Sequence, residues 1–192
     1  RKGDRGRLLI IGGGPYHGAP ILSGDAAARS GCDLVHVAMP KDARNRVEWP
    51  PHLIPESIPD EVTLTMSSVE HLIGRILSGR GVQAILIGPG LGRGKETIRA
   101  VSQLLFIASE AKIPVVVDAD AIAALPKRSW PENLRGIVTP HGKEAEEWLG
   151  SEIATIRPHL NVKNDPVSLS SVLKFLNNNK KLLRINSNIK SV

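Results

Sequence analysis

Short apolar runs, separated by stretches with helical spacing, limit most strongly what this chain of 192 residues can form. The runs lie at residues 7–14, 33–40, 84–88, 114–120 and 136–140, and a shorter alternating stretch lies at 62–66. Continuous apolar strands with helices between them are typical of a parallel sheet that helices bury on both faces. We therefore expect an α/β fold with a mostly parallel sheet and helices on both faces. Residues 41–61 contain several prolines and no period, which predicts a loop.

Glycines and polar side chains follow the ends of several expected strands. Glycine loops lie at 12–14 and 88–94, and Asp118, Asp120 and His141 also follow strand ends. Ligands of such sheets bind beyond the carboxyl ends of the strands. We expect these segments to share one rim of the sheet.

The two glycine loops admit a functional and a structural interpretation. In residues 12–20 the backbone is open to a ligand, and a helix starting near Ala19 would offer N–H groups to an anion. The loop is not a dinucleotide fingerprint, because His17 stands where the third glycine belongs. The loop at 88–94 is not a phosphate-binding P-loop, because Pro89 and Glu96 replace its glycine and its hydroxyl residue. Each loop either lines a ligand or makes a tight turn.

The polar candidates admit the same two interpretations. Asp118 and Asp120 follow a buried strand, where carboxylates can hold Mg²⁺ through water, act as base and orienter, or cap the next helix. His141 can bond a substrate phosphate or hydroxyl. Glu144 in the first turn of a helix is favourable electrostatically whatever the function.

Composition excludes several classes of protein. The single cysteine, Cys32, allows neither an internal disulfide nor a thiolate zinc site, and we expect a reducing compartment, the cytoplasm. No stretch approaches the roughly 20 apolar residues of a membrane helix. Aromatic residues make up 3% of the chain, so we expect no base-stacking surface. The basic residues of 151–192 permit weak, salt-sensitive contact with nucleic acid, but the sequence contains no recognised nucleic-acid motif, and we do not expect such a partner.

The composition changes near Gly150. All 18 glycines lie at or before this residue, and residues 151–192 carry 7 basic against 2 acidic side chains, out of a net charge of +6 for the chain. We divide the chain into a domain at 1–150 and a basic, Asn/Lys-rich tail at 151–192. The tail contains one expected helix, which Asp165 would cap and Pro166 would open.

Five segments of the chain together resemble a known family. They are residues 1–6, Gly-Gly-Gly-Pro-Tyr-His-Gly-Ala-Pro at 12–20, Gly-Pro-Gly-Leu-Gly at 88–92, Val-Asp-Ala-Asp-Ala at 117–121 and Thr-Pro-His-Gly-Lys-Glu at 139–144. In this order they resemble the ADP- or ATP-dependent NAD(P)H-hydrate dehydratases, the YjeF carboxy-terminal-domain family. That resemblance implies a ribokinase-like three-layer sandwich.

The resemblance also implies a reaction. Such enzymes repair NAD(P)HX, the hydrated form of the reduced nicotinamide cofactors, by phosphorylating the added hydroxyl with ADP or ATP in the presence of Mg²⁺. Phosphate, a good leaving group, then departs. By matching motifs, the substrate site would be lined by Ala19, Gly90, Gly92 and His141. Glu144 would help to hold Mg²⁺ through water, although Gly142 and Lys143 replace the family's usual Pro-Gly.

Two family motifs have no match in residues 151–192. They are a strand ending in Lys-Gly and a Gly-Gly-Thr-Gly-Asp loop, whose glycines cradle the phosphate and whose aspartate is the base. Since no glycine follows Gly150, we expect a sheet incomplete at its carboxy-terminal end, weak binding of NADPHX and little or no turnover. We also expect a homo-oligomer.

Two alternatives stay open. One is a non-catalytic nucleotide-binding or self-associating scaffold protein, because missing strands would leave a sheet edge open. The other is a ribokinase-like kinase for hydroxymethylpyrimidine or hydroxyethylthiazole. The Gly-Ala-Pro turn at 18–20 and the spacing of His141 and Glu144 favour the dehydratase.

Overall fold

The computed structural model describes residues 6–77 and 81–150, which fall into two compact units. The first unit comprises the described residues up to 124 together with 132–139, and the second comprises 125–131 and 140–150. Each unit is described by itself. The predicted boundary at residue 150, the predicted helix of the tail and the predicted incompleteness of the sheet lie outside the described residues.

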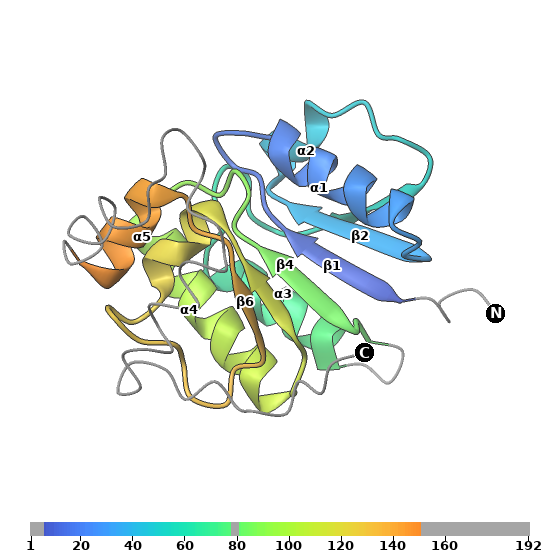
Figure 1. Ribbon diagram of the computed structural model, residues 1–192. Coiled ribbons are helices and arrows are strands. Elements are labelled where there is room, and N and C mark those ends of the chain that lie inside the picture. Colours follow the sequence, from blue (N-terminus) through green and yellow to red (C-terminus); the bar gives the residue numbers. More distant parts are fainter. Residues whose placement is uncertain (1–5, 78–80, 151–192) are drawn as a thin grey trace, which may run out of the picture. The chain divides into compact units, whose positions relative to one another are not determined.

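The first unit is built on a six-stranded sheet with the order β3-β2-β1-β4-β5-β6 (Figure 1). Its strands are β1 (Arg7–Ile11), β2 (Leu34–Met39), β3 (Leu53–Ser57), β4 (Ala84–Ile87), β5 (Val115–Val117) and β6 (Gly136–Val138). All neighbouring pairs run parallel. The predicted α/β class with a mostly parallel sheet is confirmed.

Helices cover this sheet on both faces, as predicted. Helices α1 (Gly18–Arg29) and α2 (Lys41–Asn45) lie on one face, and α3 (Met66–Leu77) and α4 (Lys95–Glu110) lie on the other (Figure 1). A 3-10 helix, η1 (Ala119–Ala124), follows β5. The second unit contains α5 (Gly142–Leu149).

The central strands are apolar throughout because both of their faces are covered. In β1, Leu9, Ile10 and Ile11 are all completely buried. Burying a side chain of this size contributes roughly 1.5–3 kcal/mol. On α3 the buried residues include Val69 and Leu72, whose spacing is that of one helix face.

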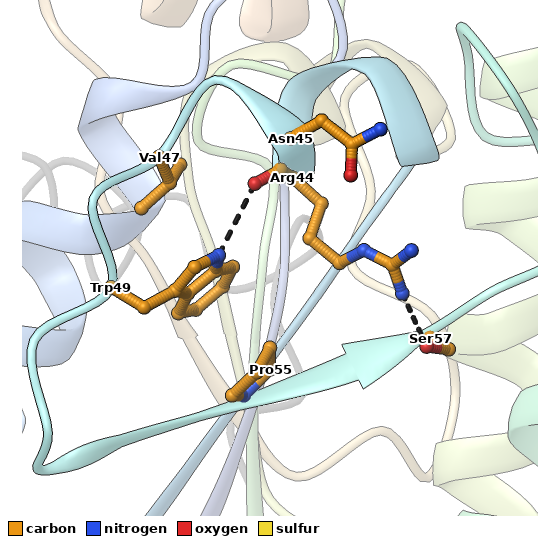
Figure 2. Close-up of a pocket in the computed structure, with 6 residues that line it drawn as sticks. All are labelled: Arg44, Asn45, Val47, Trp49, Pro55 and Ser57. Carbon is orange, nitrogen blue, oxygen red and sulfur yellow. Dashed lines mark hydrogen bonds between the residues drawn. The ribbon is translucent and has the colours of Figure 1, made fainter.

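Two local predictions are wrong. The predicted loop at 41–61 contains α2 and the edge strand β3, and the predicted strand at 62–66 leads into α3 instead. Pro55 obscured β3, because proline lacks an N–H and strands tolerate it mainly at a sheet edge. A side-chain hydrogen bond from Arg44 of α2 to Ser57 of β3 joins the two missed elements (Figure 2). Thr65 bonds the Asp60 carboxylate through its N–H and its hydroxyl, at 2.7 and 2.6 Å.

The strand order creates a point at which the chain reverses direction across the sheet. The chain runs from β1 outward to β2 and β3, and then returns to place β4 on the other side of β1. The connections that follow β1 and β4 therefore leave in opposite directions from the carboxyl ends of these strands. Open α/β sheets bind ligands at such a switch point, and we call this region the glycine crevice. The two glycine loops are these connections.

No helix in the part of the chain that the structure describes has both the length and the apolar character required to span a bilayer.

Candidate functional site

The two glycine loops meet at the crevice between β1 and β4. The N–H of Gly13 donates to the carbonyl of Pro89 at 2.9 Å, which joins the loop after β1 directly to the loop after β4. The N–H of Gly12 donates to the carbonyl of Ala38 at 3.1 Å. The expectation that both loops share one rim is confirmed.

Glycine is required where the loops approach other backbone. At Gly90, φ is +72° and an added Cβ would lie 2.3 Å from the carbonyl oxygen of Tyr16. At Gly88, φ is +131° and an added Cβ would lie 1.7 Å from the carbonyl oxygen of Asp118. Both conformations are ones that side chains rarely adopt, so the crevice is shaped by backbone packed against backbone.

Two aspartates follow β5 and point to different partners. Asp118 accepts a hydrogen bond of 2.7 Å from the hydroxyl of Thr139, at the end of β6. Asp120 accepts from the N–H of Gly92 at 2.8 Å and from Nε of Arg93 at 3.1 Å. Asp120 lies inside η1 and binds the glycine loop, so its interpretation as a helix cap is wrong.

The residue between these aspartates has an uncommon backbone conformation. Ala119 has φ of 49°, in the left-handed region that costs an alanine roughly 1–2 kcal/mol. Conformations of this kind persist where the surrounding structure imposes them, often at functional sites. Here the turn lets Asp118 reach β6 while Asp120 reaches the loop after β4.

The beginning of α1 offers unused backbone donors beside the first loop. The first N–H groups of a helix have no partner within it. The N-cap residue, His17, makes no side-chain hydrogen bond to this turn, and the turn contains no acidic residue. Ala19 is exposed there while Pro20 is buried, so the start of the helix is accessible at Ala19.

Sequence reasoning missed two residues that hold this region. Arg46 follows α2 and donates from Nη2 to the carbonyl of Gly14 at 2.8 Å. Thr139 fixes Asp118. Arg46 lies in a segment without hydrophobic periodicity. Nothing in the sequence therefore indicated that its side chain bonds Gly14. Thr139 lies in the quoted motif at 139–144, but its partner was not apparent.

In the second unit, His141 and Glu144 cap α5. The N–H of His141 donates to Oε2 of Glu144 at 3.0 Å, and the N–H of Glu144 approaches Nδ1 of His141 at 3.4 Å. Nε2 of His141 also lies 3.2 Å from Oε1 of Glu144. The Glu144 carboxylate is buried and the His141 side chain is 62% exposed. The helix-start interpretation therefore fits both residues, and their roles in a site stay predictions.

The described residues do not by themselves fit a Mg²⁺ site. Within residues 6–77 and 81–150, no three His, Cys, Asp or Glu side chains gather as a metal ion would need. Both carboxylate oxygens of Glu144 contact His141, as given above. We therefore derive no step through the metal.

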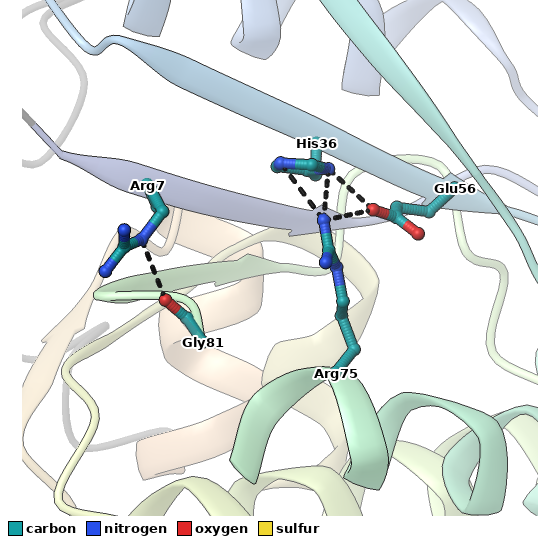
Figure 3. Close-up of polar contacts among 5 residues, drawn as sticks. All are labelled: Arg7, His36, Glu56, Arg75 and Gly81. Atoms are coloured by element: carbon teal, nitrogen blue, oxygen red, sulfur yellow. Dashed lines mark hydrogen bonds and ion pairs between the residues drawn. The ribbon is translucent and has the colours of Figure 1, made fainter. Parts of the chain in front are cut away.

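A separate polar cluster joins the sheet to α3 (Figure 3). Oε1 of Glu56 lies 2.5 Å from Nδ1 of His36 and 2.7 Å from Nη2 of Arg75. Burial and, next, the charge of Arg75 lower the pKa of His36, although Glu56 opposes this shift. The cluster links β2, the edge strand β3 and α3, and we interpret it as structural.

Comparison with known families identifies the lineage. The family model described as NAD(P)H-hydrate dehydratase (Carb_kinase) matches residues 8–179. The chain belongs to the NAD(P)H-hydrate dehydratase family. The predicted resemblance is confirmed, and the family match extends beyond residue 150, where the composition changes.

Curated relatives bear related names. A bifunctional NAD(P)H-hydrate repair enzyme Nnr of Hyperthermus butylicus is 39% identical over 81% of this chain and 29% of its own length. An ATP-dependent (S)-NAD(P)H-hydrate dehydratase of Emericella nidulans is 35% identical over 74% of this chain and 41% of its own length. An ADP-dependent (S)-NAD(P)H-hydrate dehydratase of Cenarchaeum symbiosum is 34% identical over 78% and 51%, respectively. The chain thus spans about half the length of these dehydratase relatives, or less.

A solved structure shares the fold. The crystal structure of hypothetic protein SMU.573 from Streptococcus mutans aligns with 83% of this chain and 57% of its own, with a TM-score of 0.57 and 28% identity. This similarity agrees with the α/β fold of the chain.

Proposed function

We propose that this chain serves in the nucleotide-dependent dehydration of (S)-NAD(P)HX, and that its glycine crevice binds the hydrated nicotinamide. The carrying observation is the direct contact between the loops after β1 and β4, at the point where the strand order reverses. Crevices at such points bind ligands in open α/β sheets. Family membership and the names of the relatives support the reaction.

The proposed roles follow from the geometry of the first unit. Gly90 and Gly92 pack closely against Tyr16 and Pro15 of the first loop, so the two loops form one continuous rim, and we assign the nicotinamide to this rim. The exposed start of α1 supplies the N–H of Ala19 to a polar group of the substrate. Asp120 acts indirectly, because its carboxylate fixes the loop through Gly92. Asp118 is held by Thr139 and presents a carboxylate at the ends of β5 and β6.

We assign substrate contact to His141 on the family motif alone. By the same motif Glu144 would reach Mg²⁺ only through water, with the remaining ligands supplied by the nucleotide, because the described residues do not form a metal site by themselves. In this proposal the nucleotide is ADP or ATP, and its phosphoryl group passes to the added hydroxyl oxygen. The ring nitrogen then supplies electrons as the carbon–oxygen bond to phosphate breaks, and a proton leaves the adjacent carbon. The protein contributes mainly positioning and charge stabilisation to these steps.

The test mixes the purified chain with NADPHX, Mg²⁺ and either ADP or ATP, and follows the absorbance of reduced nicotinamide. We expect NADPHX to raise the melting temperature, because a ligand that binds only the folded state stabilises it. Residues 151–192 contain no glycine and therefore no loop to cradle the phosphate. We expect the absorbance of reduced nicotinamide to return slowly or not at all. Rapid recovery would overturn the expectation of low turnover, and no thermal shift would overturn substrate binding.

A further inference from the structure

A pocket of about 360 Å³ lies between α2 and β3 in the first unit (Figure 2). This volume is within the range of small-ligand sites. None of the proposed catalytic or nicotinamide contacts uses it. It is lined by Arg44, Asn45, Val47, Trp49, Pro55 and Ser57.

One side of the pocket is built for an anion. The Arg44 guanidinium reaches across to the hydroxyl of Ser57 and donates a hydrogen bond to it (Figure 2). Among the residues that the structure describes, no carboxylate lies within ion-pair distance of Arg44. A guanidinium held beside a hydroxyl provides several converging donors, which is the geometry that binds phosphate or carboxylate.

The other side of the pocket is apolar, and its Trp49 and Val47 also pack against the hydrophobic core. The indole N–H of Trp49 donates to the carbonyl of Arg44 at 3.2 Å, which fixes the orientation of the ring. Figure 2 shows this indole next to the ring of Pro55. Val47 adds a further apolar contact. Aromatic and proline rings offer a rigid surface on which a planar group can stack.

The pocket and the glycine crevice share α2 as a common wall. On one side of α2, Arg46 bonds the carbonyl of Gly14, and Cβ of Ala43 lies 3.4 Å from where a Cβ of Gly13 would be. On another side, Arg44 faces β3. Arg44 and Arg46 are two residues apart, so their Cα atoms are at most about 7.6 Å apart. The pocket therefore lies beside the segment that holds the first glycine loop, as a subsite for the other end of the same ligand would have to.

We propose that the pocket binds the adenosine end of the nicotinamide dinucleotide, with adenine on Trp49 and a ribose phosphate on Arg44 and Ser57. This inference rests on the proposed function, which puts the nicotinamide end in the glycine crevice. Arginine is a common partner of the 2′-phosphate that distinguishes NADP from NAD. The pocket therefore gives this chain a preference for phosphorylated cofactors.

The first experiment measures binding of NADPH, NADH and adenosine 2′,5′-bisphosphate to the full chain by calorimetry. We expect NADPH to bind more tightly than NADH, and the bisphosphate to compete with NADPH. Arg44→Gln should weaken NADPH and bisphosphate binding about tenfold or more, because it removes a charge-assisted hydrogen bond. It should leave NADH binding nearly unchanged. Arg29→Gln, at an exposed arginine outside the pocket lining, is the control with the same change of charge.

A second measurement tests the stacking contact. Bound bisphosphate should quench tryptophan fluorescence in the wild type and in Trp130→Phe, but not in Trp49→Phe. Arg44→Lys should bind NADPH with intermediate affinity, since it keeps the charge and loses the planar fork. This variant replaces Arg44→Gln if the latter has a lowered melting temperature.

Several results would overturn the inference. They are equal affinity for NADPH and NADH, equal losses in Arg44→Gln and Arg29→Gln, or quenching that persists in Trp49→Phe. If the bisphosphate binds but NADPH does not displace it, the pocket takes a free mononucleotide and the inference is wrong. Failure of the repair assay with the binding pattern intact would instead count against the proposed function alone.

Discussion

The glycine crevice and the cluster of His36, Glu56 and Arg75 hold neighbouring parts of the same unit together by different means. In the crevice, backbone meets backbone, and the space for a Cβ is absent at Gly88 and Gly90. In the cluster, long side chains from β2, β3 and α3 meet through charge. A backbone contact has no rotamer with which to adapt, whereas side chains and water can rearrange. We therefore expect the crevice to tolerate substitution far less than the cluster.

The largest difference should appear when a methyl group is added to a glycine. In Gly88→Ala the new Cβ would overlap the carbonyl oxygen of Asp118, at a φ of +131°. We expect the free energy of unfolding to fall by more than about 4 kcal/mol, or the folded protein to be lost. Urea denaturation measures this.

Gly74→Ala is the matched control for that substitution. Gly74 lies within α3, and an added Cβ there meets nothing within 4 Å. We expect a gain of roughly 0.5–1 kcal/mol from helix propensity. Similar effects at the two glycines would contradict the view that the crevice depends on absent side chains.

The second largest effect should come from the charged cluster. Glu56→Gln removes the carboxylate that both His36 and Arg75 contact, and we expect a loss of about 1–3 kcal/mol in the free energy of unfolding. Glu61→Gln breaks the pair with Lys41, whose side chains are 60% and 51% exposed, and should cost less than about 1 kcal/mol. Chemical denaturation of both variants compares them, and equal losses would show that burial adds nothing to the cluster.

A smaller effect is expected where a side chain supports the crevice. Asp120→Ala removes the acceptor for the N–H of Gly92 and the partner of Arg93. We expect NADPHX to bind about fivefold more weakly, because one hydrogen bond that fixes the loop contributes about 1 kcal/mol. Thermal shift against NADPHX concentration measures the change. Asp25→Ala, which breaks the half-exposed pair with His52 elsewhere in the unit, should leave the affinity unchanged.

The smallest effect should be the pH dependence that His36 confers. Its pKa is lowered in the folded state, chiefly by burial, so the unfolded chain binds the proton more readily. The associated stability is complete above about pH 6.5 and is lost as the pH falls through the folded pKa. The free energy of unfolding, measured by denaturation at several pH values across this range, should depend less on pH in His36→Asn than in the wild type. Glu56→Gln should move the loss to lower pH, since Glu56 raises the pKa of His36. A slope unchanged in His36→Asn would contradict this assignment.

The sequence predicted the parts of the fold that carry a regular pattern. Central strands read as apolar runs because helices bury both faces, and α3 and α4 showed their buried positions at helical spacing. The edge strand β3 was missed because an exposed edge needs no apolar run and accepts Pro55.

The candidate site was predictable only in part. Glycines and aspartates at strand ends indicated the rim. The contacts that fix it are not visible in the sequence, because Arg46 and Gly14, or Asp120 and Gly92, come from distant segments. The direction in which Asp118 and Asp120 point depends on the left-handed turn at Ala119, an alanine that no sequence rule marks.

Pro55 in the middle of β3 has a consequence for the behaviour of the sheet in crowded solutions. An edge strand presents backbone groups on which another chain can extend the sheet, and this leads to aggregation or strand exchange. Proline has no N–H to offer, so β3 is a poor template for an added strand. The residue that concealed the strand in the sequence also protects that edge from uncontrolled pairing.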